Sequence, residues 1–341
     1  MKSIFIPATA APDAGADVAK QTALTLARID ERLRADQSSL ADAVAVTVYL
    51  RSASEFAAMN DAYRQAWTSA PPTRTTVVTA PVTPDAIVEM SAVAVPSGAD
   101  RRVVHPSSWM MSPNPYSYGI RNGETLWLSG LLARRGRDNT PVPGDVAVQT
   151  RAVLDNAKEL LEAAGLSLSH VVSARVFLTD LADFAEMNRV YREYFADAPP
   201  ARATVGASLT APPYNVEMTF VASAGSRRAI DAQPKNPNLS SAVVAGDTVY
   251  VSGLLAPEAS LGDPAGETRE ILKRLDAALA SAGSGRAAIR DLLVYATSPA
   301  AANTAAAICR DAAGHAAITS AHVGLVLAKA TVEIMTVAQQ P

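Results

Sequence analysis

The sequence contains the run Pro199-Pro200-Ala201-Arg202-Ala203-Thr204-Val205, which is followed by Val216-Glu217-Met218. The same arrangement occurs earlier as Pro71-Pro72-Thr73-Arg74-Thr75-Thr76-Val77 and Val88-Glu89-Met90. In both places an arginine follows a Pro-Pro turn at the start of an apolar strand, and a glutamate interrupts the next apolar strand fifteen positions later. If these strands are paired, Arg and Glu could hold a carboxylate and a water side by side. Each pair is therefore a candidate reaction site or a structural ion pair.

Around these pairs the first part of the chain repeats in its middle at a constant offset of 128 positions. For example, Val48-Tyr49-Leu50 corresponds to Val176-Phe177-Leu178. A third, more divergent copy follows, in which residues 246–255 resemble residues 123–132. Repetition at this scale predicts three copies of one structural unit. The units are expected at 1–97, which lacks an N-terminal hairpin, at 98–224, which is the most complete, and at 225–341, which is degenerate and lacks the arginine.

The second unit gives the clearest order of elements. A strand at 124–131 is followed by a helix that Asp145 caps and Gly165 ends, a strand at 171–178, a helix at 181–195, and the strands of Arg202 and Glu217. This order predicts one mixed sheet with two helices on one face, which is an α+β unit. Because the other face of each sheet is apolar, we expect three units to form a pseudo-trimer within one chain, with sheets inside and helices outside. We expect a monomer, with dimerisation through the gap of the missing hairpin as the alternative.

The composition is that of a folded protein with no obvious nucleic-acid partner. Of 341 residues, 49% are hydrophobic and 18% are charged, and 30 Lys and Arg oppose 33 Asp and Glu for a net charge of −3. No apolar run approaches the ~20 residues of a membrane helix, so we expect a cytoplasmic protein without a membrane partner. The single cysteine, Cys309, excludes an internal disulfide. The four histidines do not have the spacing of a metal site: His105, His170, His315 and His322.

These features resemble those of the Rid family (YjgF/YER057c/UK114). The second unit carries the resemblance most fully, in the runs Pro115-Tyr116-Ser117, Leu128-Ser129-Gly130, Phe177 to Phe184, Pro200-Ala201-Arg202 and Val216-Glu217. The resemblance covers nearly the whole chain, once per unit, and is partial in the third. It implies a chorismate-mutase-like α+β unit, a trimer fused into one polypeptide, and ligand sites in clefts between neighbouring units. It also implies hydrolysis of reactive 2-imino or enamine acids to 2-keto acids and ammonia, with no metal or organic cofactor.

The resemblance also implies roles for individual residues. The arginine that binds the substrate carboxylate corresponds to Arg202 and Arg74, and the glutamate that places the attacking water corresponds to Glu217, Glu89 and Glu333. The remaining substrate-binding positions correspond to Tyr116, Ser129, Asn188 and Asn60. The third unit departs from this pattern, with Ile318 in place of the arginine and Leu239 in place of the tyrosine. We therefore expect Arg202 with Glu217 to form the best-equipped site, Arg74 with Glu89 the second, and Glu333 to be structural.

Three functions remain open from the sequence. The first is a deaminase of 2-imino or enamine acids, a hydrolase acting on C=N bonds, with a small carboxylate-bearing substrate. The second is a small-acid-binding or scaffold protein without catalytic activity, which the divergent third unit favours. The third is a pathway-specific hydrolase on the same pseudo-trimer plan. Ribonuclease activity, which has also been ascribed to this family, is not supported by the slightly acidic charge balance.

Overall fold

The computed structural model describes residues 3–231 and 235–340, which form three units of similar structure. The first unit contains β1 (Ile4–Ala10), α1 (Val18–Ala35), β2 (Ala43–Leu50), α2 (Phe56–Arg64), β3 (Thr73–Val78) and β4 (Val88–Ala94). The second contains β5 (Arg101–Val104), β6 (Gly119–Asn122), β7 (Thr125–Leu128), β8 (Leu131–Leu132), α3 (Val146–Ala163), β9 (Val171–Leu178), α4 (Phe184–Tyr194), β10 (Ala201–Gly206), β11 (Ser208–Leu209) and β12 (Val216–Ser223). The third contains β13 (Arg227–Ile230), β14 (Ala242–Ala245), β15 (Thr248–Leu255), α5 (Pro264–Ser281), β16 (Ile289–Ala296), α6 (Pro299–Ala313), β17 (Ala317–His322), β18 (Gly324–Leu325) and β19 (Val332–Gln339).

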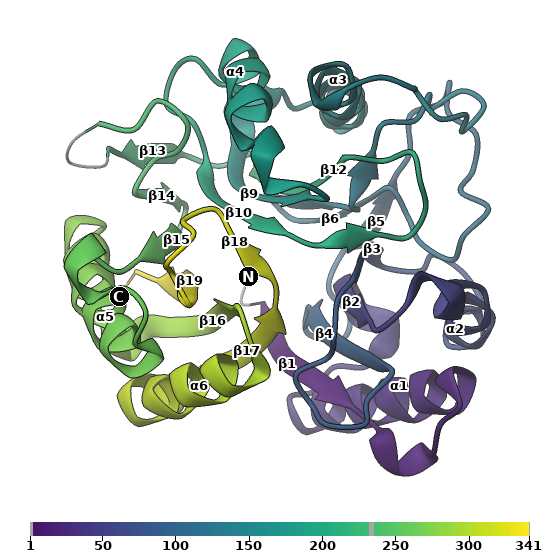
Figure 1. The fold of residues 1–341 in the computed structure, drawn as a ribbon. Coiled ribbons are helices and arrows are strands. Elements are labelled where there is room, and N and C mark those ends of the chain that lie inside the picture. Colours follow the sequence, from purple (N-terminus) through teal and green to yellow (C-terminus); the bar gives the residue numbers. More distant parts are fainter. Residues whose placement is uncertain (1–2, 232–234, 341) are drawn as a thin grey trace.

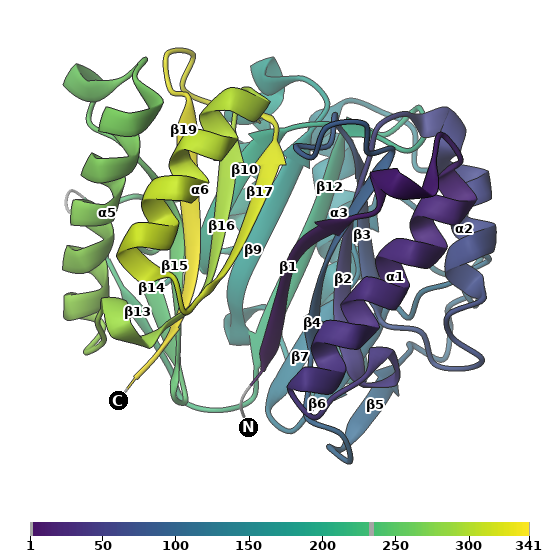
Figure 2. The same cartoon turned by 90° about the horizontal axis from the view of Figure 1, so that it is seen from below.

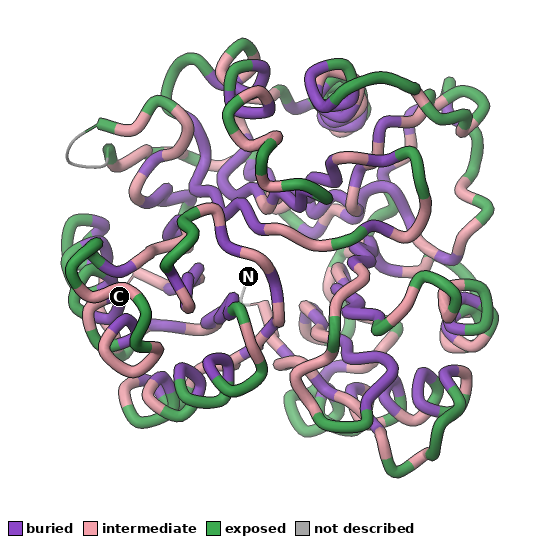
Figure 3. Tube along the Cα trace, viewed as in Figure 1, coloured by how far each residue is buried: buried purple, intermediate pink, exposed green. Residues whose placement is uncertain are grey.

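The helices lie on the outside of the molecule and the sheets face its centre. In Figure 1 the pairs α1 and α2, α3 and α4, and α5 and α6 surround the strands. Figure 2, turned by 90°, shows the strands of the units running side by side, with both chain ends at the same end of the molecule. Buried segments concentrate on the strands and on the inner faces of the helices (Figure 3). The predicted α+β units with helices outside and sheets inside are therefore confirmed.

The same signal starts the first helix of each unit. The side chains of Asp17, Asp145 and Asp263 accept hydrogen bonds from backbone N–H groups of the first turn. These groups have no partner within a helix, so a capping carboxylate stabilises the helix start by about 1 kcal/mol. The predicted cap at Asp145 is confirmed, and Gly165 follows the helix with a positive φ of 71°.

The order of strands places one central strand between the arginine strand and the glutamate strand. In the second unit β9 runs parallel to β10 and antiparallel to β12, and β2 and β16 have the same two neighbours in their own sheets. The sheet of the first unit ends at β1, whereas β7 and β15 continue into the hairpin strands β6 and β14. The hairpin that the sequence lacks in the first unit is thus absent from its sheet. Among the helices that the structure describes, none is long and apolar enough to cross a membrane.

Two of the units each add a short strand to the sheet of a neighbouring unit. The second unit contributes β11 to the sheet of the first, where Leu209 pairs with Val77. The third unit contributes β18 to the sheet of the second, where Leu325 pairs with Val205. At the remaining boundary the hydroxyl of Thr79 donates to the carbonyl oxygen of His322. Each unit therefore extends or contacts the edge strand of a neighbour.

Because these strand additions occur within one polypeptide, we predict that the chain is a monomer in solution. Multi-angle light scattering should return about the 35.5 kDa of a single chain. A stable dimer would instead favour association through the exposed edge of β1, which has no hairpin strand beside it. A trimer of whole chains would contradict the prediction.

Candidate active site

The arginine and the glutamate of one unit do not lie on paired strands. Strand β9 separates β10, which carries Arg202, from β12, which carries Glu217. Strand β2 separates β3, which carries Arg74, from β4, which carries Glu89. The expected pairs within one unit are therefore wrong, because the sequence spacing counts residues along the chain and does not show the strand inserted between them.

The structure instead brings together charges from neighbouring units. Arg74 of the first unit lies close enough to Glu217 of the second for each to affect the other's pKa. Arg202 of the second unit has the same relation to Glu333 of the third. Glu333 was expected to be structural because its own unit lacks an arginine, but the second unit supplies one in Arg202. Two clefts each contain one arginine and one glutamate, and we call them the Arg202 cleft and the Arg74 cleft.

In the Arg202 cleft the guanidinium is held on one side and free on the other. Arg202 is only 2% exposed, and its Nη2 donates to Oδ1 of Asn188 at 2.6 Å. The ring centroid of Tyr191 lies 4.5 Å from its Cζ, and its backbone N–H donates to Oγ of Ser252 in the third unit at 2.8 Å. Among the described residues, Nε and Nη1 of Arg202 have no hydrogen-bond partner. A buried guanidinium edge with free donors is suited to a carboxylate.

A large cavity lies beside Arg202. The cavity measures about 780 Å³ and is lined by Arg202 and by Glu333 from the next unit. Leu239 lines it as well, in the place where the family resemblance expects a tyrosine. The cavity is comparable in size to a small-molecule site. It therefore offers room for a substrate whose carboxylate contacts Arg202 and whose reacting carbon lies near Glu333.

The carboxyl group of Glu333 lies against a glycine and is protonated more readily than an ordinary glutamate. Burial raises its pKa from 4.5 to about 8, and Arg202 acts in the opposite direction. A Cβ atom added at Gly253 would lie 1.8 Å from Oε1 of Glu333, so only glycine leaves room for this carboxyl group. A carboxyl group with a pKa near neutrality can both accept and donate a proton at physiological pH.

Side chains from the first helix of the unit position the strand of the glutamate. Glu267 on α5 accepts hydrogen bonds from the backbone N–H groups of Thr331 and Val332, immediately before Glu333. Gln149 on α3 accepts from the backbone N–H of Asn215, shortly before Glu217. No role was predicted for Glu267 and Gln149 from the sequence. Each follows the capping aspartate of its helix, Asp263 or Asp145, by one turn, and this spacing on the buried face is the signal that could have identified them.

The Arg74 cleft has the same parts in a more crowded arrangement. The Cζ of Arg74 lies 4.9 Å from the ring centroid of Tyr63 and 5.6 Å from that of Tyr116, which belongs to the second unit. The backbone N–H of Arg74 donates to Oγ of Ser129 at 2.9 Å. At the mouth of this cleft a cavity of about 30 Å³ is lined by Tyr116 but does not reach Arg74. Tyr191 lies over Arg202 as Tyr63 lies over Arg74, so it is the ring of Tyr116 that occupies space beside the arginine where the Arg202 cleft has Leu239.

The other predicted residues of the Arg74 cleft also lie there. Asn60 donates to Oδ1 of Asn114 at 3.3 Å, whereas its counterpart Asn188 contacts its arginine directly. Burial raises the pKa of Glu217 to about 8, while the backbone of Thr76 and the charge of Arg74 act in the opposite direction. The glutamate of this cleft therefore has the same chemical character as Glu333.

The boundary between the third and first units lacks this constellation. Ile318 stands on β17 where the other units have arginine, and Thr319 beside it accepts a hydrogen bond from the backbone N–H of Ala8. Glu89 is engaged by its own unit, since Val82 N–H and Thr83 N–H donate to its carboxylate at 2.7 and 3.0 Å. Within the described residues, Glu89 therefore has a structural role. At this boundary Ile318 stands in place of an arginine, so nothing here supports the catalytic role that was expected for Glu89.

The raised pKa of Glu333 predicts a pH-dependent effect of Glu333→Gln on stability. The folded protein retains a proton on Glu333 that the unfolded chain loses above pH ~4.5. The wild type is therefore destabilised as pH rises from about 4.5 to the folded pKa of about 8, whereas the amide is unaffected. Thermal unfolding at pH 5 and pH 8.5 should show the variant gaining stability relative to wild type at the higher pH. The exposed Glu162 is the control, and an equal effect at both pH values would contradict the prediction.

Comparison with known proteins accounts for the three units. The family model described as Endoribonuclease L-PSP matches residues 7–96, 108–224 and 230–340. The chain belongs to this family. A RutC family protein of Sulfurisphaera tokodaii is 49% identical to this chain over 111 residues, which are 33% of this chain and 89% of that protein. A 2-iminobutanoate/2-iminopropanoate deaminase of Bos taurus is 36% identical over 103 residues, which are 30% of this chain and 75% of that protein.

Solved structures of the L-PSP family match one unit at a time. The crystal structure of the YjgF gene product from E. coli covers 36% of this chain and 98% of its own, with 31% identity and a TM-score of 0.34. The three matches of the family model and the similarity to these relatives confirm the resemblance to the Rid (YjgF) family, with three tandem units in one chain. Each relative named here is similar to about a third of the chain.

Proposed function

We propose that this protein hydrolyses 2-imino acids, or their enamine tautomers, to 2-keto acids and ammonia, and that the Arg202 cleft is its principal site. The observation that carries the proposal is that Arg202 and Glu333 line one cavity of about 780 Å³. Nε and Nη1 of Arg202 are buried without a hydrogen-bond partner among the described residues, and the pKa of Glu333 is raised to about 8. The similarity of one unit to a 2-iminobutanoate/2-iminopropanoate deaminase supports this choice of reaction.

The proposed reaction begins with binding of the substrate carboxylate to Nε and Nη1 of Arg202. Asn188 fixes the guanidinium from the opposite side, and Ser252 holds the backbone of the arginine strand. A bidentate contact of this kind is about twice as strong as a hydrogen bond between neutral groups and sets the orientation of the substrate. The C=N carbon of a small imino acid is then directed toward Glu333.

Glu333 provides the proton transfers. As a carboxylate it accepts a proton from the water that attacks the C=N carbon, so that a C–O bond forms and the nitrogen takes up the electron pair of the C=N bond. As a carboxylic acid it then returns the proton to this nitrogen, which gives a neutral carbinolamine. The carboxylate next takes the hydroxyl proton of the carbinolamine and passes it to the nitrogen, so that the C–N bond breaks and ammonia leaves as the C=O bond forms. A pKa near neutrality suits both directions of transfer. Water does the covalent work, so no nucleophilic side chain is required.

The Arg74 cleft would be a secondary site. It has the same pair of charges in Arg74 and Glu217, but the ring of Tyr116 lies over its arginine in addition to that of Tyr63. Substrate binding there would require Tyr116 to move or to stack against the ligand, and Ser129 and Asn60 would line the site. We therefore assign the larger share of activity to the Arg202 cleft.

The test generates imines in the assay from a panel of amino acids with an amino-acid oxidase and follows their decay. The proposal expects faster decay when the wild-type protein is present, with equal amounts of keto acid and ammonia formed. Unchanged decay for every imino acid would contradict it. If crystals soaked with a small 2-keto acid then showed the ligand on Arg202, a small-acid-binding function without catalysis would replace the proposal.

A further inference from the structure

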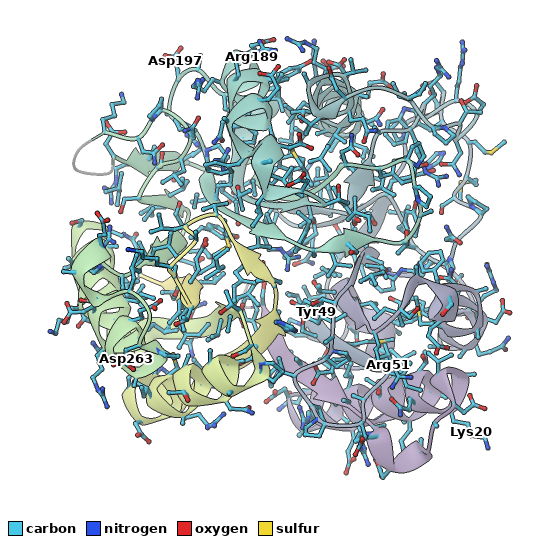
Figure 4. All side chains as sticks on the ribbon, in the orientation of Figure 1. Lys20, Tyr49, Arg51, Arg189, Asp197 and Asp263 are labelled. Atoms are coloured by element: carbon cyan, nitrogen blue, oxygen red, sulfur yellow. The ribbon has the colours of Figure 1, made fainter. Side chains whose placement is uncertain are left out.

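A second cavity lies at the centre of the molecule, apart from both clefts. It measures about 120 Å³, and its lining includes Ala45 and Thr47 on β2, Ser173 and Arg175 on β9, and Asp291 on β16. These are the central strands of the three sheets. Figure 4 labels Tyr49, which follows Thr47 on β2, and places it toward the middle of the molecule, whereas Lys20 and Asp263 lie at the periphery. A cavity of this volume has room for several water-sized groups.

The strand register arranges the lining side chains in layers. Thr47 pairs with Ser91, and Arg175 pairs with Thr219 at the equivalent position of the second unit. In the third unit the equivalent position is Leu293, which pairs with Met335. One layer of the cavity is therefore formed by Thr47, Arg175 and Leu293.

The next layer lies two residues earlier along each central strand. It is formed by Ala45, Ser173 and Asp291, which pair with Val93, Val221 and Val337 in their own sheets. Two residues of a strand span roughly 6–7 Å. A cation of the second unit and an anion of the third therefore line adjacent layers of the same cavity. In a trimer of identical chains each layer would repeat one residue three times, whereas this chain places a single arginine and a single aspartate in the two layers.

The two charges are not paired with each other. Among the described residues, Arg175 has no carboxylate oxygen within 4.0 Å, and its recorded side-chain hydrogen bond is from Nη2 to Oγ1 of Thr47 at 3.2 Å. Asp291 likewise has no ion-pair partner within that distance in the described part of the chain. Burial raises the pKa of Asp291 to about 7, with Arg175 acting in the opposite direction. Charges of opposite sign that face one cavity without touching leave space for a ligand that contacts both.

A polar cavity adjoins the central cavity at the end of the molecule where the chain begins. It measures about 280 Å³ and shares Phe5, Trp127 and Tyr250 with the lining of the central cavity. Ser3 lies at its rim, on the unit that has no N-terminal hairpin. Figure 2 shows this end, where the N-terminus lies between the units. The polar cavity also shares Val337, the strand partner of Asp291, and therefore lies next to the layer of Asp291.

We propose that the central cavity binds a small α-amino acid, whose carboxylate contacts Arg175 and whose ammonium group contacts Asp291. Hydroxyl groups of Thr47, Ser173 and Thr219 supply further hydrogen-bond partners around the ligand. A small α-amino acid carries these two opposite charges on adjacent carbons. A side chain larger than that of alanine or serine would meet Leu293 and Met335, which line the same cavity.

Calorimetric titration of the whole protein with glycine and with L-alanine tests this proposal. Acetate and ethylamine, each of which carries one of the two charges, are the ligand controls. Matched variants come from the chain itself, because Arg175→Thr and Asp291→Ser install the residues that the other units have in the same layers. Each variant is expected to weaken amino-acid binding about tenfold or more, since each removes a charge-assisted contact. Unchanged binding in both variants would overturn the proposal.

The clefts also contain arginines that could bind an amino acid, so the binding must be located. The double variant Arg74→Ile and Arg202→Ile, which copies Ile318 of the third unit, should retain the binding of glycine and alanine. A crystal of the wild type soaked with L-alanine gives the same answer without a variant. Density between Arg175 and Asp291 supports the proposal, whereas density only in the clefts, or none, contradicts it. The inference does not depend on imine hydrolysis, because its readout is binding at the centre.

Discussion

Replacing Glu333 by Gln is expected to lower the rate of imine hydrolysis by roughly 10²–10⁴-fold, which is the usual effect of removing a positioned acid–base group. The amide preserves the shape of the side chain but cannot take the proton of the attacking water. Because Arg202 is unchanged, binding of the 2-keto acid product should be nearly retained. Single-turnover decay of enzymatically generated imines, measured beside product binding, separates these two effects.

The matched variants are Glu217→Gln and Glu89→Gln, which change the equivalent residue of the other units. We expect a smaller loss for the first, because its cleft is crowded by Tyr116, and none for the second, because Glu89 is bonded to its own unit. Arg202→Ile should chiefly weaken binding, by about 1.5–3 kcal/mol for the lost charged contact. Equal activity of Glu333→Gln and wild type would exclude the Arg202 cleft as the principal site.

The fold was largely predictable because the sequence repeats itself. The constant offset between the first two units revealed the copies, and Asp145 and Gly165 marked the ends of a helix that the structure confirms. The missing hairpin of the first unit was visible for the same reason, since one copy of a repeat shows what another lacks. These signals are local, so they can be recognised without knowing how strands are ordered in space.

The partners in the clefts were not predictable in this way. Arg202 and Glu217 stand fifteen positions apart in one unit, yet β9 lies between their strands. The proximity of Arg202 to Glu333 depends on how the second and third units pack, and no spacing in the sequence encodes it. The central pair Arg175 and Asp291 was missed for a related reason. Each is a single charge in a strand, and only the layering of three sheets brings them into one cavity.

Replacing Gly253 by Ala is expected to abolish most activity, about 10²-fold or more, while changing the free energy of unfolding by no more than about 1 kcal/mol. The new Cβ would lie 1.8 Å from Oε1 and 2.8 Å from Cδ of Glu333, so the carboxyl group must leave its position beside the cavity. The two closest atoms belong to the end of a flexible side chain, which can rotate. Cβ of Ala203, at 3.0 Å from the new Cβ, needs to shift by only a few tenths of an ångström, so the fold should persist. The measurement is imine decay together with chemical unfolding of the same preparation.

Gly130→Ala provides the matched control, because its Cβ would lie at the same 1.8 Å from Oε1 of Glu217 in the Arg74 cleft. Both substitutions displace a carboxyl group, Glu333 in one case and Glu217 in the other, and the new Cβ at Gly253 lies in addition 3.0 Å from Cβ of Ala203. If the Arg202 cleft carries most of the turnover, Gly253→Ala should be nearly inactive and Gly130→Ala nearly as active as wild type. The reverse pattern would move the principal site to the Arg74 cleft. Activity that survives both substitutions, with both proteins folded, would show that neither glutamate positions the water, because no arrangement of either cleft could keep its carboxyl group in place beside a methyl group.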